Sequence, residues 1–472
     1  MTARARITAV PVPALAPDRL EPFVGRERVE RLERTAEAVR ARLGGRRVVN
    51  VNSTATGGGV AEMLQTLLGY VRGAGLATEW LVIDGDPAFF TVTKRIHNGL
   101  YGGPGDGGPL GEAERAQYEQ TAAGNLSGLR DALRPADVVI VHDPQPAGLV
   151  PALRADGHAV VWRCHVGLDA ANDWSERAWE FLRPYVEDAR AFVFSRGAFA
   201  PRWVDEGRLA VIPPAIDPLA PKNEALDRET VVGVLAAAGL IASDDVAPHS
   251  GVSRPAQIVR EGGAPAADTP LVVQVSRWDR MKDMAGVMRA FASGVDASTG
   301  AHLVLAGPAV EGVEDDPEGL EVWNETVELW RSLAAPERER IHLAAIPMED
   351  PRENALVVNA LQTHAVVVVQ KSLAEGFGLT VSEAMWKSRP VVASAVGGIA
   401  DQIVDRESGL LLDDPADLER MGELVSSVLA SPAEAARLGA NARRRVAERF
   451  LPDRQLTQYA ELLERLIPEP RG

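Results

Sequence analysis

Residues 371–389 read KSLAEGFGLTVSEAMWKSR, and they join a predicted buried strand to a predicted helix. The apolar run Ala365–Val369 before them is typical of a buried parallel strand, and Val381–Lys387 favours a helix. Glu375 therefore lies on the loop at the carboxyl end of a strand, and Glu383 in the first turn of the next helix. Open α/β sheets bind ligands at this edge, where glycines allow close backbone approach and a helix start presents free N–H groups.

The composition is typical of a soluble globular protein with more than one domain. The chain has 472 residues, of which 46% are hydrophobic and 25% are charged, and its net charge is -16. This acidity argues against a nucleic acid as a general partner. The single cysteine, Cys164, permits no disulfide within the chain, and the first residues lack an apolar signal core, which together favour the cytoplasm. No stretch of the sequence has the roughly 20 apolar residues that a membrane helix needs.

Two series of alternating strands and helices predict two doubly wound α/β domains, each Rossmann-like, with a cleft between them. The predicted bounds are 1–217 for an N-terminal domain; 218–270 for a linker with a mobile loop, rich in Ala, Gly, Pro and Ser; 271–450 for a C-terminal domain; and 451–472 for a last helix that crosses back to the N-terminal domain. The lead-in 1–25 is expected to be irregular.

A glycine-rich loop follows the first core strand of the N-terminal domain. Gly57, Gly58 and Gly59 lie between the strand Arg47–Val51 and a helix predicted over Val60–Arg72. Such a loop suits an anionic or polyhydroxyl ligand held at a helix N-terminus. It is neither a G-x-G-x-x-G motif nor a P-loop. A tight turn between strand and helix explains the same residues equally well.

Two later strands each deliver a histidine at the carboxyl end, His142 and His165. A lone histidine is usually structural, but two at equivalent strand ends favour a ligand contact for at least one of them. Asp84 and Asp86 match a D-x-D metal motif, but the D-G dipeptide between them favours a turn. No metal site is assigned from the sequence.

Together these motifs resemble the retaining glycosyltransferases of family 4, which have the GT-B fold. The resemblance extends over about Arg47–Asp414 and rests on Gly57–Gly59, Arg277 with Lys282, Glu375 with Glu383, and Gly397-Gly398. A narrower match is to the glycosyltransferring trehalose synthases, a group similar to the retaining trehalose phosphorylases. It is carried by Val51–Thr54, Gly57–Met63, His142–Pro146, Arg163–His165, Ile216–Leu219, Lys222-Asn223 and Glu375–Lys387.

The resemblance implies transfer of glucose, with retention, from a nucleoside diphosphate glucose to free glucose, which gives α,α-trehalose. The expected partners are a small sugar and a sugar nucleotide, without nucleic acid or membrane, and a homodimer is left open. No cofactor is expected to be required. Mg²⁺ is compatible with this chemistry, but the sequence does not imply it.

The resemblance also assigns roles to individual residues. Arg277 can hold phosphate oxygens through a bidentate fork and Lys282 adds a point charge, although a solvated loop end is the structural alternative. Glu375 is assigned to the donor glucose and the backbone of His165 to the reacting carbon. The donor-binding set is Gly57, Gly58, Gly59, Phe377, Gly378, Leu379, Thr380 and Glu383, and the weaker acceptor-binding set is Lys94, His97, Asn98 and Asp143.

Several alternatives stay open at this stage. A capping box with Thr380 would explain Glu383 without any ligand. A trehalose phosphorylase would use glucose 1-phosphate as donor, a sugar-nucleotide epimerase of the GT-B fold would need no acceptor, and a silent sensor would bind the donor without turnover. No pair of carboxylates stands out as the nucleophile and acid of a glycosidase.

Overall fold

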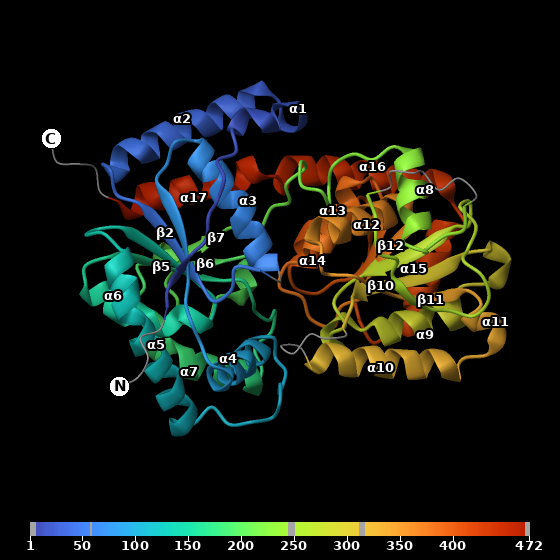
Figure 1. Cartoon of the computed structure of the whole chain (residues 1–472), viewed down its shortest axis with the longest axis horizontal. Helices are drawn as coiled ribbons and strands as arrows, with labels where there is room; N and C mark the ends of the chain where they lie inside the picture. Colours follow the sequence, from blue (N-terminus) through green and yellow to red (C-terminus); the bar gives the residue numbers. More distant parts are fainter. Residues whose placement is uncertain (1–5, 57–58, 244–250, 311–316, 468–472) are drawn as a thin grey trace. The chain divides into compact units, whose positions relative to one another are not determined.

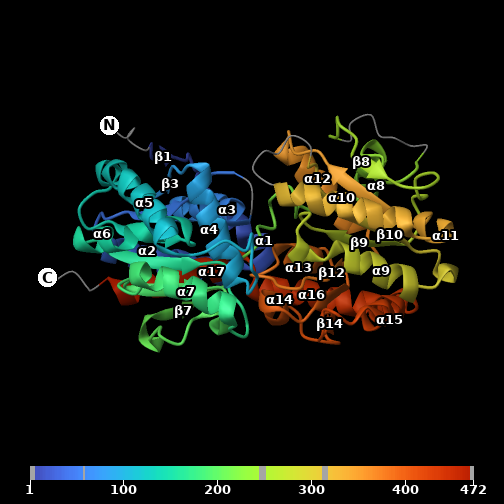
Figure 2. The same cartoon turned by 90° about the horizontal axis from the view of Figure 1, so that it is seen from below.

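The computed structural model of the chain describes residues 6–56, 59–243, 251–310 and 317–467. It divides into two compact units, the first comprising Met1–Ala215 with Phe450–Gly472 and the second Ile216–Arg449 (Figures 1 and 2). Each unit is an α/β domain built on one largely parallel sheet. The prediction of two doubly wound α/β domains is therefore confirmed. Within the described ranges, every helix is too short or too polar to cross a membrane.

The sheet of the first unit has the strand order β1-β3-β2-β4-β5-β6-β7. Its neighbours pair in parallel except β1, which is antiparallel to β3. The chain passes from β2 to β3 on one side and then to β4 on the other, so the topological switch point lies between β2 and β4. The strands are β1 (Thr8–Ala9), β2 (Val48–Asn52), β3 (Thr78–Val82), β4 (Val138–His142), β5 (Ala159–Cys164), β6 (Ala191–Phe194) and β7 (Leu209–Val211).

Helices cover both faces of this sheet because the strand side chains alternate between them. Val48 and Ile140 pack under α2 and α17, whereas Val49 and Val139 pack under α4, α5 and α7. Figure 1 shows these two layers, with α2 beside α17 on one face. The helices are α1 (Glu21–Val24), α2 (Arg26–Leu43), α3 (Gly59–Gly73), α4 (Pro87–Leu100), α5 (Glu112–Ala132), α6 (Val150–Ala155), α7 (Asp173–Val186) and α17 (Pro452–Leu466).

The sheet of the second unit has the order β14-β13-β12-β9-β10-β11-β8, and its switch point lies between β9 and β12. Among the described strands of this sheet, β8 alone runs antiparallel, beside β11. The strands are β8 (Gln257–Val259), β9 (Leu271–Val275), β10 (His302–Pro308), β11 (Ile341–Ile346), β12 (Val367–Gln370), β13 (Val391–Ser394) and β14 (Leu410–Leu412). The helices are α8 (Arg228–Ala237), α9 (Met284–Gly294), α10 (Pro317–Ser332), α11 (Ala335–Arg338), α12 (Pro351–His364), α13 (Leu379–Trp386), α14 (Gly397–Gln402), α15 (Leu418–Leu429) and α16 (Pro432–Arg449).

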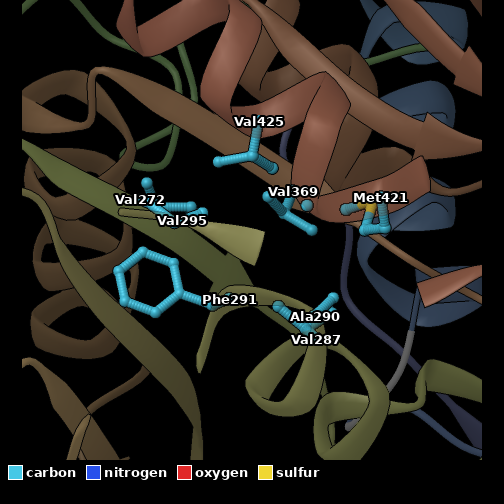
Figure 3. A pocket seen from close by; sticks show the side chains of 9 residues that line it. Val272, Val287, Ala290, Phe291, Val295, Val369, Met421 and Val425 are labelled. Atoms are coloured by element: carbon cyan, nitrogen blue, oxygen red, sulfur yellow. The ribbon is translucent and has the colours of Figure 1, made fainter. Parts of the chain in front are cut away.

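The core of the second unit contains a small apolar void between α9, α15 and the sheet (Figure 3). Its volume is about 10 Å³, and its walls include Phe291, Val369 and Met421. A space of this size and polarity is a packing defect rather than a ligand site. The candidate site must therefore be sought at the strand ends.

The segment 218–270, predicted as a linker with a mobile loop, belongs to the second unit and contains regular structure. Helix α8 lies within it and packs against α12, with Val231, Val234 and Leu235 buried. Strand β8 also lies within it and adds an edge to the sheet of the second unit. Burial against an existing core stabilises these elements more than local propensity does. Residues 244–250 of the expected mobile loop lie outside the described residues.

One smaller expectation also needs correction. The lead-in 1–25 is not wholly irregular, since β1 pairs with β3 and α1 precedes α2. A two-residue edge strand carries too little alternation to be read from sequence. At the other end, Phe450–Gly472 belongs to the first unit, where α17 packs on α2 and Arg28 forms an ion pair with Asp453 (Nε–Oδ2 2.7 Å). The cleft between the domains stays a prediction.

Candidate active site

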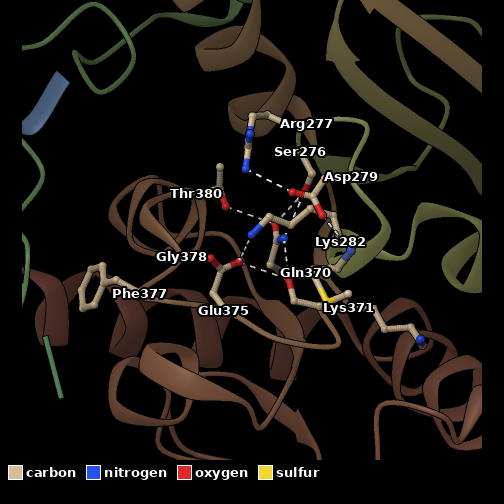
Figure 4. Close-up of polar contacts among 12 residues, drawn as sticks. Ser276, Arg277, Asp279, Lys282, Gln370, Lys371, Glu375, Phe377, Gly378 and Thr380 are labelled. Carbon is tan, nitrogen blue, oxygen red and sulfur yellow. Dashed lines mark hydrogen bonds and ion pairs between the residues drawn. The ribbon is translucent and has the colours of Figure 1, made fainter. Parts of the chain in front are cut away.

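The side chains predicted to carry the chemistry flank the switch point of the second sheet. Arg277 and Lys282 follow β9, and Glu375 follows β12, which is the neighbouring strand. Because parallel strands end at the same edge, residues almost a hundred positions apart meet there. Figure 4 shows the groups around this point, with the Phe377 ring turned away from the polar side chains.

Hydrogen bonds join the loop after β9 to the loop after β12. Gln274, which is fully buried in β9, donates from Nε2 to the carbonyl of Lys282 (2.8 Å) and accepts at Oε1 from the amide of Lys371 (3.2 Å). The amide of Leu373 donates to the carbonyl of Met281 (2.7 Å). One buried side chain thus fixes the relative position of the two loops.

A buried ion pair reinforces this junction. The Nζ of Lys371, a residue with 1% exposure, contacts Oδ2 of Asp283. Asp283 has a positive φ of 44° and also caps α9, because its Oδ1 accepts from the amide of Gly286 (3.0 Å). Such a cap with a left-handed conformation needs tertiary support. Lys371 supplies that support, so it positions the loop that carries Lys282.

Replacing Lys371 by methionine should destabilise the protein. The substitution keeps the length of the side chain but leaves the carboxylate of Asp283 without its buried cation. Loss of one partner of a buried pair typically costs about 3–5 kcal/mol, and we expect the low end because the Asp283 side chain is 21% exposed. Thermal unfolding should show the loss. An unchanged melting temperature would mean that the pair does not hold the loops.

Lys282 and Glu375 form an ion pair at the centre of the site. Their Nζ and Oε2 atoms are 2.6 Å apart, and the side chains are 16% and 9% exposed. Ser372 adds a hydrogen bond from Oγ to the same carboxylate oxygen (3.2 Å). Arg277 lies closer to solvent, 61% exposed, with NH2 3.1 Å from Oδ2 of Asp279. The site therefore holds a cation that an incoming phosphate can draw away from its carboxylate.

Helix α13 begins at Leu379, so its N-terminus directly follows the loop that carries Glu375. Gly378 is its N-cap, with φ of 85°, and no side chain caps the helix. The first amides of α13, those of Leu379 and Thr380 among them, are therefore open to an acceptor, and the helix dipole favours an anion there. The buried amide of Gln402 donates to the carbonyls of Phe377 and Gly378, which fixes this turn.

The capping-box alternative for Glu383 is wrong. The helix starts at Leu379 rather than after Thr380, so Glu383 is one turn inside α13. The hydroxyl of Thr380 instead donates to Oε1 of Gln370 (3.1 Å). Glu383 is 3% exposed, and it lies beside Lys387, whose pKa burial lowers to about 8. A carboxylate so deeply placed without a capping role is consistent with a binding function.

A second pair of glycines packs under the Glu375 loop. Gly397 has a φ of 51°, and a Cβ there would lie 1.7 Å from the carbonyl oxygen of Glu375. The amide of Gly398 donates to the carbonyl of Gly376 (3.2 Å). The V-G-G motif of the sequence thus allows α14 to approach the backbone that presents Glu375.

In the first unit, His142 at the end of β4 meets His165, which directly follows the neighbouring strand β5. Their rings stack at 5.5 Å with Nδ1 of His142 3.2 Å from Nε2 of His165. Asp143, with φ of 65°, accepts at Oδ1 from the amide of His165 (2.7 Å). Burial, with the charge of Arg163, lowers the pKa of His142 to about 3 and that of His165 well below its usual range. Both rings are therefore neutral at physiological pH.

Burial also raises the pKa of Asp143 to about 7. A folded-state pKa above the ordinary 3.8 adds stability at low pH, and this stability is lost as the pH rises through 7. Asparagine keeps the acceptor for His165 and tolerates positive φ. Asp143→Asn should therefore melt above the wild type at pH 8, with the difference shrinking toward pH 4. His142 and His165 are present in both proteins, so their contributions to the pH dependence cancel. Equal melting temperatures of the two proteins at pH 8 would contradict a raised pKa for Asp143.

The remaining predicted residues are not gathered at one place. Gly57 and Gly58 lie outside the described residues, and Gly59 is the first residue of α3. Lys94, His97 and Asn98 lie on α4, and their acceptor role stays a prediction. Asp86 caps α4 by accepting from the amide of Phe89 (2.7 Å). Among the residues that the structure describes, no cluster of three or more His, Cys, Asp or Glu could hold a metal.

Sequence reasoning missed the residues that position the site, namely Gln274, Asp283, Gln370, Lys371 and Gln402. Four of these are almost fully buried polar side chains. The sequence does mark three of these residues as buried polar side chains. Gln274 interrupts a run of valines that predicts a buried strand, and Gln370 and Lys371 end another. A polar residue in such a run needs a partner, and at a strand end that partner is a neighbouring loop.

Comparison with known proteins identifies the family of the chain. Residues 50–201 match the model of the trehalose synthase N-terminal domain, and 257–445 match that of the glycosyl transferases group 1. A trehalose synthase of Rubrobacter xylanophilus is 36% identical, covering 90% of this chain and 92% of its own. The chain belongs to the trehalose synthase family. A further member, the trehalose synthase of Pyrococcus horikoshii, is 33% identical over 94% of this chain and 95% of its own.

Membership in the trehalose synthase family makes this protein a glycosyltransferase in trehalose metabolism. A trehalose phosphorylase of Pleurotus pulmonarius is more distant, at 28% identity over 76% of this chain and 49% of its own. Solved structures confirm the GT-B fold. A UDP-forming trehalose-phosphate synthase of Burkholderia xenovorans superposes with a TM-score of 0.64 at 16% identity, covering 89% of this chain and all of that one. The trehalose-6-phosphate synthase OtsA gives 0.67 at 13% identity, covering 90% and 100%.

Proposed function

We propose that the protein transfers glucose from a nucleoside diphosphate glucose to free glucose and forms α,α-trehalose with retention. The observation that carries this proposal is the set of Arg277, Lys282 and Glu375 at one switch point, beside the N-terminus of α13. Two cations and a helix start suit a diphosphate, and a carboxylate within 2.6 Å of one of them suits the adjoining sugar. The relatives named trehalose synthases support trehalose as the product.

Binding of the donor would rearrange the central ion pair. Arg277 and Lys282 hold the phosphate oxygens, so that Lys282 leaves Glu375 as the diphosphate arrives. The freed carboxylate of Glu375 then accepts hydrogen bonds from the glucose hydroxyls. The backbone amides on the same loop donate hydrogen bonds to these hydroxyls, namely those of Phe377, Gly378 and Leu379. Glu383 takes the ribose hydroxyls.

The chemical step balances without an enzymatic nucleophile. The bond from the glucose C1 to the phosphate oxygen breaks, and the acceptor oxygen bonds to C1 on the same face. The acceptor hydroxyl gives its proton to the departing phosphate oxygen, which leaves as the nucleoside diphosphate. Arg277 and Lys282 stabilise the charge on that phosphate, and the backbone carbonyl of His165 stabilises the cationic C1. The proposal gives no proton transfer to the imidazole of His165, because burial holds its pKa well below the usual range and makes the ring a weak base.

The trehalose phosphorylase relatives favour one alternative, in which phosphate replaces the nucleotide and glucose 1-phosphate is the donor. Running the reaction backward separates the two. We expect trehalose with UDP, ADP or GDP to give a nucleoside diphosphate glucose and free glucose. Trehalose with phosphate alone should give nothing. Formation of glucose 1-phosphate without nucleotide would overturn the proposal in favour of the phosphorylase.

A further inference from the structure

Lys387, the C-cap residue of α13, is a cation that the proposed chemistry does not use. Its Nζ donates to the backbone carbonyl of Glu383 one turn earlier (3.1 Å) and to Oδ1 of Asn223 (3.3 Å). Glu383 is 3% exposed, and it is the residue proposed to hold the ribose hydroxyls of the donor. Lys387 therefore joins the candidate ribose-binding residue to a segment outside its own helix.

Asn223 is itself held from several sides. It is 5% exposed, its Nδ2 donates to the carbonyl of Asp217 (2.9 Å), and its own carbonyl accepts from Nε1 of Trp386 (3.2 Å). Because Nδ2 has a backbone acceptor, Oδ1 is the end of the amide that faces Lys387. The same segment is bound to α12 by the buried Asn359, whose Nδ2 donates to two of its carbonyls (both 2.9 Å). Asn223 thus gives the ammonium a fixed anchor.

The charges of Lys387 and Glu383 attract one another. Burial lowers the pKa of Lys387 to about 8, the carboxylate of Glu383 acts against this lowering, and the charge of Lys222 adds to it. The amine is therefore mostly protonated at pH 7. A cation near a buried carboxylate favours the ionised form of that carboxylate. Glutamate four residues before lysine is also the order in which such pairs stabilise a helix.

Ribose recognition depends on this ionised form. An ionised carboxylate only accepts hydrogen bonds, so it can take one from each of two neighbouring hydroxyls. A protonated carboxyl is a donor at one oxygen and makes only neutral hydrogen bonds, which are roughly half as strong. The charge of Lys387 therefore bears on how well Glu383 can bind a ribose.

We propose that Lys387 is a positioning residue for the donor ribose: anchored by Asn223, it fixes the backbone of Glu383 and keeps the Glu383 carboxylate ionised, so that this carboxylate binds both ribose hydroxyls. Lys387 acts through Glu383 and needs no contact with the donor. This role rests on the proposed function, which supplies the nucleotide donor and the role of Glu383.

Calorimetric titration of the intact protein with nucleoside diphosphates tests this role. UDP, ADP and GDP are each compared with the 2′,3′-dideoxy analogue, which lacks both ribose hydroxyls. For the base that the wild type accepts, we expect the ribonucleotide to bind about 10- to 100-fold more tightly than the analogue, the effect of hydrogen bonds to a charged group.

Lys387→Met keeps the length of the side chain and removes its charge and its donor. This variant should bring the affinity ratio of the two nucleotides below about threefold and leave the Kd of the dideoxy analogue within about twofold of the wild type, because only the contact with the hydroxyls is lost. Lys387→Gln keeps a donor without the charge. It should lower the ratio in the same way, and it decides if the methionine variant does not fold.

Arg443→Met is the matched control, since Arg443 also bonds to the C-terminal end of α13, from NH1 to the carbonyl of Trp386 (2.6 Å). It should keep the wild-type ratio whatever its stability. A wild-type ratio in Lys387→Met or Lys387→Gln, or a ratio lost in Arg443→Met as well, would overturn the role of Lys387 and leave the proposed function standing. A wild type that binds no nucleoside diphosphate, or binds both forms equally, would overturn the role of Glu383 and that of Lys387 with it.

Discussion

Glu375→Gln is expected to lower kcat about 30- to 1,000-fold, which corresponds to 2–4 kcal/mol of transition-state stabilisation. Glutamine keeps the shape of the side chain but removes the charge that pairs with Lys282 at 2.6 Å. In the proposed donor complex it also removes a charged acceptor for the sugar hydroxyls. Because that interaction strengthens as C1 becomes cationic, the loss should fall on kcat more than on KM.

Glu353→Gln provides a matched control for this experiment. Glu353 is another buried glutamate of the second unit, and it accepts from the amides of Ser253 (2.7 Å) and Arg254 (2.8 Å) on a helix away from the switch point. The control should lose stability to a similar degree and keep its turnover. Near-normal kcat in Glu375→Gln, or an equal loss in both variants, would remove Glu375 from the site.

Arg277→Ala is expected to lower kcat/KM for the donor about 100- to 1,000-fold, the effect of losing one charged group that stabilises a leaving diphosphate. Its side chain is 61% exposed and, among the residues that the structure describes, it pairs across a loop with Asp279. The free energy of unfolding should therefore change by no more than about 0.5 kcal/mol. A collapsed melting transition would show instead that Arg277 is structural.

Arg280→Ala serves as the control on the same loop. Arg280 is directed to α10, where it contacts Glu321 (2.9 Å) and Glu325 (2.7 Å). Its removal deletes an equal charge three residues away, so a general electrostatic effect on the donor would appear in both variants. We expect a loss of activity in Arg277→Ala alone. Comparable losses would mean that the loop attracts the nucleotide without a specific contact.

The sequence was sufficient to place the candidate site residues at strand ends. Valine runs such as Ala365–Val369 predict buried parallel strands, and motifs that follow such runs lie at one edge of the sheet by topology alone. The strand order itself could not be read in this way, because pairing between β9 and β12 joins segments that almost a hundred residues separate. That Glu375 contacts Lys282 became visible only with this order.

The contacts that hold the candidate site in place could not be predicted from short stretches of sequence. Lys371 and Asp283 look like ordinary charged residues of two loops, and only the fold shows them paired with Lys371 buried. Helix α8, within the segment 218–270, is likewise held by burial against α12 more than by its own propensity. In each case the stabilising free energy comes from contacts between residues far apart in sequence. A short stretch of sequence does not contain both partners of such a contact.

The product of the forward reaction tests the central claim most directly. UDP-, ADP- and GDP-glucose labelled with ¹³C at C1 are each incubated with the protein and unlabelled glucose, and the product is identified by NMR. We predict α,α-trehalose with the label in one half of the molecule, and one nucleoside diphosphate released per disaccharide. A β-linked product, labelled free glucose alone, or a sugar nucleotide converted without any acceptor would contradict it.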